Sequence, residues 1–268
     1  MDTTGLSVLM EDTSEFYDDT FTMPSAASKR LYWTLNGPLE SSIQVAPSPY
    51  YEPGDVMEPY FRPGDADSSL PPSWHPISQE SLMDPPVTTI TVRVQCIDSW
   101  EELWVDLYRD QIDTRTDPRR PRAQDVQLEV KASGPFLTVH EYVSAVHPWL
   151  MGLRERILDA KGRTRLQPPW PPETKLAVLR FGRGPMNIDK EDMDMWASRH
   201  RKPGPPVQLT PAQREEAHRK VIERMKERSA ARIRELERLR QEGNNQPIII
   251  DSRTGRVVRP EVDREAGA

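Results

Sequence analysis

The chain of 268 residues contains one cysteine, Cys96, so it cannot form an internal disulfide. Small secreted domains commonly depend on several disulfides, whereas reducing compartments keep thiols free. No apolar run approaches the ~18 residues of a membrane-spanning helix. The first fifteen residues also lack the basic start and apolar stretch of a secretory signal. We therefore expect a soluble protein of the cytoplasm or the nucleus.

Apolar residues are scarce, at 36% of the chain, and prolines are frequent, at 27. The formal net charge is −6, from 36 Lys and Arg against 42 Asp and Glu. Residues 1–86 hold twelve of the prolines and a net charge of 3 − 14 = −11. Such a composition is typical of segments that cannot bury enough apolar surface to fold. The sequence therefore predicts a disordered, acidic, proline-rich tail over residues 1–86.

Alternating apolar and polar residues predict strands over 88–97 and 125–132, with Cys96 on the buried face of the first. The more continuously apolar stretch 175–181 predicts a third, central strand. Two main helices would pack on this sheet. We therefore expect an α+β domain over residues 87–202, with a small three-stranded mixed sheet whose strand order stays open.

The longer of the two main helices is expected over residues 138–162. Thr138 and Glu141 have the T-x-x-E spacing of a capping box, in which each side chain accepts from the other residue's backbone N–H. Pro148 removes one backbone donor, which predicts a kink there or a second helix that begins at this residue. The other helix is expected to open at Ser99, which precedes Glu102 at the same spacing.

Beyond the domain, residues 203–209 are expected to be a linker, 210–243 a charged helix, and 244–268 a tail with a short hairpin. The helix carries ten Lys and Arg and seven Glu over residues 211–242. Four of its apolar residues fit positions a and d of a heptad, but Ser229 and Arg232 interrupt the seam. Weak self-association through 211–242 is therefore predicted.

The only candidate nucleophile or metal set is Cys96 with His140 and His147. A Cys–His pair can activate a thiolate, and two histidines with Glu141 could hold a metal ion. The second histidine is seven residues after the first, whereas the zinc-protease helix needs four. We therefore assign no catalytic residue, metal or cofactor, and favour a non-enzymatic role.

Candidate partner-binding residues are the tryptophans Trp149 and Trp170 and the basic cluster of Arg199, Arg201 and Lys202. Trp149 adjoins the expected kink, and Trp170 lies between prolines, which favours exposure. These features favour a protein–protein interaction or scaffold protein. Two alternatives stay open. One is a nucleic-acid-associated factor that uses the basic clusters and the charged helix, and the other is an enzyme with a Cys/His site.

Overall fold

The computed structural model describes most of the chain between residues 22 and 243, and four residues beyond. The described residues are 22–52, 54–64, 70–110, 112–182, 184–204, 210–243, 249–250 and 257–258. The chain divides into two compact units, each assembled from separated stretches. Unit 1 is Met1–Gln95, Gln127–Glu155 and Pro171–Arg201, and unit 2 is Cys96–Val126, Arg156–Trp170 and Lys202–Ala268.

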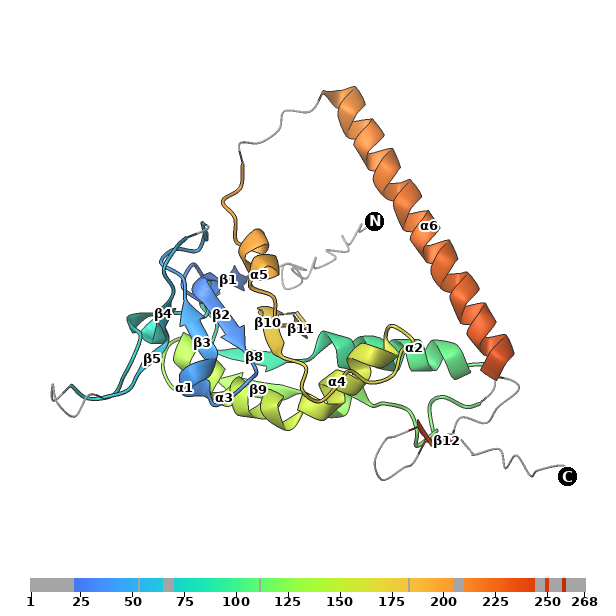
Figure 1. Ribbon diagram of the computed structural model, residues 1–268, viewed down its shortest axis with the longest axis horizontal. Helices are drawn as coiled ribbons and strands as arrows, with labels where there is room; N and C mark the ends of the chain where they lie inside the picture. The colour runs from blue at the N-terminus through green and yellow to red at the C-terminus, as the bar shows by residue number, and fades with distance from the viewer. Residues whose placement is uncertain are drawn as a thin grey trace, which may run out of the picture. The chain divides into compact units, whose positions relative to one another are not determined.

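Unit 1 is built around a five-stranded antiparallel sheet in the order β11-β10-β2-β3-β4 (Figure 1). Its strands are β2 (Leu31–Thr34), β3 (Ile43–Val45), β4 (Glu58–Pro59), β10 (Leu176–Arg180) and β11 (Asn187–Lys190). In β10, Val178 pairs with Ile188 on one side and with Trp33 on the other. The first four residues of β10 are all buried. A strand covered on both faces needs such a continuous apolar run.

Three short antiparallel pairs complete the strands of unit 1. They are β1 (Met23–Pro24) with β7 (Met83–Asp84), β5 (Phe61–Arg62) with β6 (Ser73–Trp74), and β8 (Thr89–Val92) with β9 (Leu128–Lys131). In β8, Ile90 and Val92 are buried while Thr89 and Thr91 are exposed. This alternation is that of a strand with one buried face.

Helix α3 (Val139–Gly152) packs against β9, against helix α1 (Leu39–Ser42) and against the short 3-10 helix η3 (Pro76–Gln79). The predicted capping box is confirmed at its start. The backbone N–H of Glu141 donates to Thr138 Oγ1 at 3.1 Å, and that of Thr138 donates to Glu141 Oε2 at 2.9 Å. Hydrogen bonds from Ser133 and Thr138 lower the pKa of Glu141 to about 2.

Helix α3 continues through Pro148 and ends at Gly152, and α4 (Arg154–Arg163) follows. The prediction that Pro148 opens a second helix is therefore wrong. Pro148 is exposed and has no backbone N–H, so the carbonyl of Ser144 lacks the helical donor four residues later. The guanidinium of Arg154 donates to the Leu35 carbonyl at 2.9 Å, which anchors the residue after the break to the end of β2.

The core of unit 1 is an aromatic cluster between α3 and the sheet. The ring of Trp33 is fully buried and meets the rings of Tyr142 and Phe181 edge to face, at 6.2 and 6.0 Å between centroids. Tyr142 and Phe181 are stacked at 5.8 Å. Three elements far apart in the chain therefore share one set of ring contacts, each worth about 0.5–1.5 kcal/mol beyond burial.

Unit 2 contains most of α2 (Gln95–Tyr108), where Leu103 and Trp104 are buried. One carboxylate organises the segment that follows. Glu101 accepts from the guanidinium of Arg120 at 2.6 Å and from the backbone N–H of Ala123 at 2.7 Å, where the 3-10 helix η4 (Ala123–Asp125) begins. The segment that leads into η4 is therefore fixed to α2 by a charge-assisted hydrogen bond, which is stronger than a neutral one.

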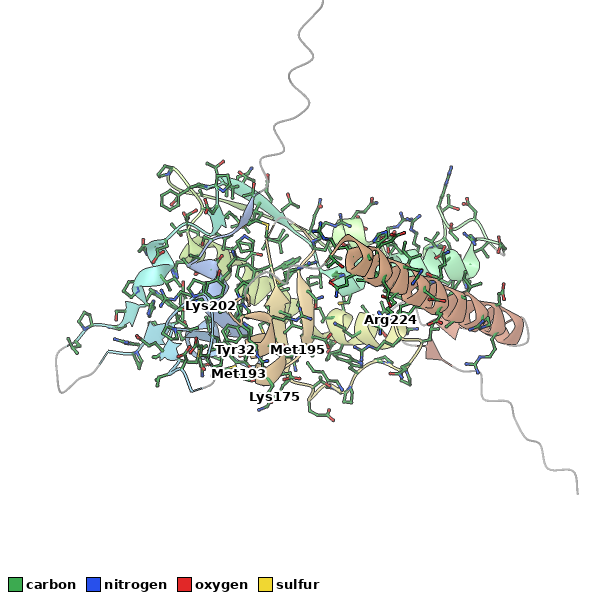
Figure 2. All side chains as sticks on the ribbon, turned by 90° about the horizontal axis from the view of Figure 1, so that it is seen from above. Tyr32, Lys175, Met193, Met195, Lys202 and Arg224 are labelled. Carbon is green, nitrogen blue, oxygen red and sulfur yellow. The ribbon has the colours of Figure 1, made fainter. Side chains whose placement is uncertain are left out.

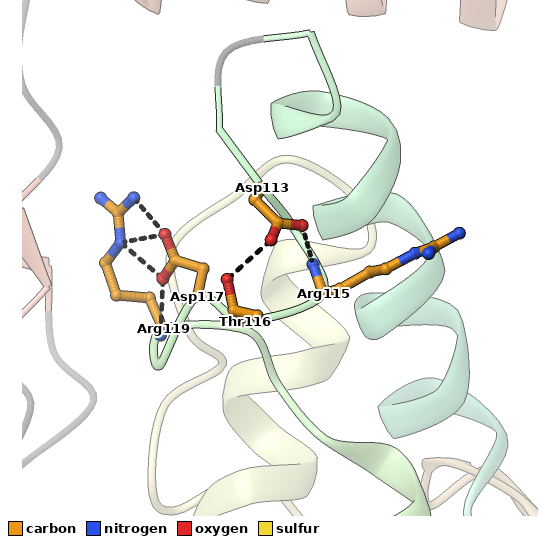
Figure 3. Close-up of polar contacts among 5 residues, drawn as sticks. All are labelled: Asp113, Arg115, Thr116, Asp117 and Arg119. Atoms are coloured by element: carbon orange, nitrogen blue, oxygen red, sulfur yellow. Dashed lines mark hydrogen bonds and ion pairs between the residues drawn. The ribbon is translucent and has the colours of Figure 1, made fainter.

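Between Glu101 and Arg120 the chain makes two turns, and each is stabilised by an aspartate of the turn itself (Figure 3). Asp113 accepts from the backbone N–H of Arg115 at 3.0 Å and from the Thr116 hydroxyl at 2.8 Å. Asp117 accepts from the Arg119 side chain at 2.7 Å. The hydrogen bonds from Thr116 and Arg119 lower the pKa of Asp113 and Asp117, respectively. Arg119 is thus paired within its own loop.

Beyond residue 202, unit 2 contains the long charged helix α6 (Pro211–Gly243) and the antiparallel pair β12 (Ile249–Ile250) and β13 (Val257–Val258). In unit 1, strand β11 ends at Lys190 and the short helix α5 (Met193–Arg199) follows it. The predicted linker 203–209 lies mostly outside the described residues.

The α+β class is confirmed, with sheets packed against helices. Two finer predictions are wrong. The three expected strands do not form one sheet, because β8 pairs with β9 while β10 joins β2 and β11. The described residues between 22 and 86 are not a disordered tail, because they supply three strands of the main sheet, and residues 1–21 of the predicted tail lie outside the described residues. Composition misled here, since short strands buried by distant partners need few apolar residues of their own.

The expectation that Cys96 lies in a strand over residues 88–97 is also wrong. Helix α2 begins at Gln95, so Cys96 and Ile97 lie in its first turn, and both are buried. Asp98 in the same turn favours a helix start through the helix dipole. Apolar residues at 96, 97, 103 and 104 fit the helical period as well as the end of a strand. Across the described part of the chain, no helix is long and apolar enough to cross a membrane.

Gly162 gives a test of the packing of α4 against the backbone of Pro168 and Pro169. A Cβ atom there would lie 2.1 Å from the Pro168 carbonyl oxygen, whereas a Cβ at Gly152 would meet nothing within 4 Å. We expect Gly162→Ala to lower the free energy of unfolding by about 1–3 kcal/mol through overpacking. The matched Gly152→Ala should be neutral or raise it by up to about 1 kcal/mol through helix propensity. Urea unfolding of both variants measures the contrast, and equal effects would contradict this packing.

Candidate functional site

Helix α6 starts from a second capping box. The backbone N–H of Thr210 donates to Gln213 Oε1 at 2.9 Å, and that of Gln213 donates to Thr210 Oγ1 at 3.3 Å. Pro211 occupies the first helical position, where its missing donor costs nothing. Lys220 pairs with Glu216 one turn before it at 2.7 Å. These local terms support a helix of 33 residues, which is about 50 Å long.

Every described side chain of α6 is exposed, including large apolar ones. Val221 is 54% exposed, Ile222 39%, Met225 63% and Ile233 55%. These residues and Ser229 recur three, four and seven positions apart, so they lie along one side of the helix. We call these five residues the apolar stripe. A stripe of this kind on an exposed helix is typical of a surface for a second helix.

A row of cations borders the apolar stripe. Lys220, Arg224 and Arg228 are four residues apart, and each comes directly before a stripe residue in the sequence. At 3.6 residues per turn they lie about 100° around the helix from Val221, Met225 and Ser229. We call these three cations the basic ridge, and Figure 2 labels one of them, Arg224, on α6.

Two glutamates of α6 lie on the side of the helix that faces away from the stripe. Glu223 and Glu227 follow Val221 and Met225 by two residues, which places them about 200° away. Between Val221 and Ser229 the surface of the stripe and its ridge is therefore apolar and cationic, although the ridge residue Lys220 is already paired with Glu216. The sequence-based heptad used Ile222 and Met225 but missed Val221, Ile233 and the ridge. The four-residue spacing of the ridge was the available signal.

The described residues give no support to the candidate nucleophile and metal set of Cys96, His140 and His147. His140 and His147 lie on α3 in unit 1, whereas Cys96 belongs to unit 2 and is buried. Among the described residues, no group of three His, Cys, Asp or Glu side chains is placed to hold a metal ion.

His147 uses both ring nitrogens inside the fold. Its Nδ1 accepts from the indole N–H of Trp33 at 3.0 Å, and its Nε2 lies 2.8 Å from the Gly37 carbonyl oxygen. An indole only donates and a carbonyl only accepts, so the ring must be neutral with its proton on Nε2. Burial, the largest influence, lowers its pKa. This histidine therefore joins α3 to β2 and has no lone pair left for a metal or substrate.

His140 lies in a second aromatic group and is only partly buried. Its ring centroid is 4.6 Å from that of Trp74, and its Nδ1 is 3.4 Å from the Tyr60 hydroxyl. The Ser144 hydroxyl lies 3.3 Å from Nε2. Burial lowers the pKa of this imidazole too. Its partners are rings and hydroxyls, which position it against the β5–β6 pair.

Of the two candidate tryptophans, only Trp170 differs from expectation. Trp149 is half-buried on α3, whereas Trp170 is 7% exposed. The prediction that Trp170 is exposed is therefore wrong. Lys161 Nζ lies 5.5 Å and the Arg165 guanidinium 5.1 Å from its ring centroid. The charged groups of both side chains lie over the ring, a contact that the neighbouring prolines do not reveal.

The basic cluster remains accessible, since Arg199, Arg201 and Lys202 are all exposed. Between the two arginines, His200 turns inward and stacks on Trp196 at 4.1 Å. Trp196 in turn donates to the Leu31 carbonyl at 3.1 Å, which fixes the end of α5 on β2. Figure 2 shows Met193, from the same helix, near Tyr32 of β2, against whose cluster it packs. Arg199 and Arg201 therefore project from an anchored helix end.

The neutral state of His147 predicts an acid sensitivity. Its folded pKa lies below the ordinary value of about 6.5, so only the unfolded chain takes up the proton as the pH falls below that value. Stability should therefore be complete above about pH 7 and decline toward pH 5, by at most about 1.4 kcal/mol per pH unit for one proton.

The measurement is urea unfolding at several pH values. His147→Gln can keep both hydrogen bonds without titrating, so its stability should depend less steeply on pH than that of the wild type. His218→Gln, at an exposed position on α6, should leave the slope unchanged. An unaltered slope in His147→Gln would show that this imidazole does not carry the effect.

Comparison with protein-family models, with curated proteins and with solved structures finds no match to this chain.

Proposed function

We propose that this is a non-enzymatic interaction protein, whose binding element is α6 and whose partner is an amphipathic helix flanked by acidic residues. The supporting observation is the apolar stripe with the basic ridge beside it. Four large apolar side chains exposed along one side of a helix are costly in water unless a partner covers them. We place this activity in the cytoplasm or the nucleus, in line with the single cysteine.

The chemistry of the partner follows from the two parts of the surface. An apolar helix face would cover Val221, Ile222 and Met225, since helix pairs interlock side chains three and four residues apart. Carboxylates along one flank of that face would meet Lys220, Arg224 and Arg228. Complementary charge fixes orientation and speeds association more than it adds affinity. Self-association of two α6 helices is less favourable, because the ridges would carry the same charge.

Nucleic-acid binding is the second candidate, because the ridge and the exposed Arg199, Arg201 and Lys202 are all cationic. Phosphate contacts of that kind lose affinity steeply as salt rises. The apolar stripe argues for a protein partner instead, since it offers nothing to a phosphate backbone.

The experiment replaces Met225 with a photoreactive phenylalanine analogue and irradiates cells that express the full chain. Glu223, on the other side of α6, is the matched control position. Adducts should form at position 225 and not at 223, and their peptides should map to an acidic amphipathic helix. Equal adducts at both positions, or adducts to nucleic acid, would contradict the proposal.

The identified partner is then purified and titrated by fluorescence anisotropy. Met225→Glu should weaken binding at least tenfold, because a buried methionine contributes about 1.5–3 kcal/mol and 1.4 kcal/mol is a factor of ten. Ala230→Glu adds the same charge away from the stripe and should change the affinity less than about twofold. Equal weakening by the two variants would show that overall charge, and not the stripe, determines binding.

A further inference from the structure

We propose that Ser229 of α6 is a phosphorylation site for a protein kinase whose substrate groove is lined with carboxylates. Ser229 is the only serine, threonine or tyrosine in residues 211–243, and it is exposed. It is also one of the five residues of the apolar stripe. The modification itself does not depend on the proposed function, whereas its effect on partner binding rests on it.

The cations before Ser229 follow the period of an extended chain. Arg224, Lys226 and Arg228 lie five, three and one residues before the serine, and all three are exposed. Alternate residues of an extended segment point to the same side. Once extended, this segment therefore presents three cations on one side, while Glu227 points to the other. A groove lined with carboxylates recognises such a row by complementary charge.

Helix α6 can open locally to give this extended form. No described side chain of α6 is buried, so opening a few residues exposes no apolar core. The helix then loses only its own propagation terms, which amount to a factor of about 1–1.6 per residue for good helix formers. Ser229 is itself a weaker helix former than the two alanines that follow it. The segment around Ser229 is therefore accessible to an enzyme that binds its substrates extended.

Thr164, directly after α4, has a similar local sequence without this freedom. Lys161 and Arg163 lie three and one residues before it. Lys161 Nζ lies 5.5 Å from the Trp170 ring centroid, and Arg163 pairs with Asp159 at 2.8 Å. Thr164 is itself half-buried. Extending this segment gives up those contacts, so it should resist the kinase although its cations have the right spacing.

Phosphorylation transfers the γ-phosphoryl group of magnesium ATP to the Ser229 hydroxyl. The serine oxygen forms a bond to the γ-phosphorus, the bond from that phosphorus to the ADP oxygen breaks, and the hydroxyl proton passes to a carboxylate of the kinase. The product carries about −1.5 to −2 charges at pH 7. These charges lie in the apolar stripe, four residues from both Met225 and Ile233. They repel the acidic flank of the partner and oppose its apolar face, so phosphorylation should release the partner.

The test is phosphorylation of the purified full chain with magnesium ATP and the catalytic domain of protein kinase C, chosen for its acidic substrate groove. Mass spectrometry of the digested chain follows the phosphate on each residue with time. Ser229 should be modified nearly completely, and Thr164 should take up phosphate at least about tenfold more slowly. An unmodified Ser229, or an equal rate at Thr164, would overturn the inference.

Two variants with the same loss of charge assign recognition to the extended row. Lys226→Gln removes the middle cation of the row and should lower the initial rate at Ser229 several-fold. Arg219→Gln removes a cation ten residues before the serine, and should change that rate less than about twofold because it lies well beyond the screening length. Equal effects would show that overall charge, and not the row, determines recognition, and so would overturn the assignment. Glutamine is a good helix former, so circular dichroism should show α6 retained in both variants.

The partner captured at position 225 separates this inference from the proposed function. By fluorescence anisotropy, the phosphorylated chain should bind that partner at least about tenfold more weakly, and a phosphatase should restore the original affinity. Equal affinities of the modified and unmodified chains would overturn the release and leave both the phosphorylation and the proposed function standing. Modification of Ser229 in a chain that forms no partner adduct at position 225 would overturn the proposed function and leave the phosphorylation standing.

Discussion

The neutral imidazole of His147 is the contact on which unit 1 most depends. It joins the indole of Trp33 to the carbonyl of Gly37, and so connects α3 to β2 and to the turn that follows it. A buried donor or acceptor that loses its partner costs about 1–3 kcal/mol. These two hydrogen bonds therefore fix the position of α3 relative to β2. The rings of Tyr142 and Phe181 pack around the Trp33 indole that they hold in place.

Helix α6 has the opposite character. Its stability comes from local terms, namely the Thr210–Gln213 cap, favourable propensity and the Glu216–Lys220 pair. No described side chain of α6 is buried, so its apolar stripe remains available for another helix. A binding element that forms without tertiary packing can present its face without first giving up contacts elsewhere. That is why the functional argument centres on α6 and not on the histidines of unit 1.

Structure could be predicted from the sequence where the residues that determine it lie within a few positions of one another. The capping box at Thr138 follows from the reach of two side chains over one turn, and the burial of β10 follows from its apolar run. It failed where distant residues decide. Trp170 is covered by Lys161 and Arg165, and the Trp33–His147 hydrogen bond spans more than a hundred residues.

The sequence by itself determined the α+β class, the helix cap at Thr138 and the charge pattern of α6. Each arises from periodicity or from side chains within a few positions of one another. Only the tertiary structure decided that residues 31–45 belong to the main sheet, and that His147 is a structural imidazole and not a ligand. Pairing between strands and the burial of a ring depend on partners remote in the chain, which no local pattern specifies.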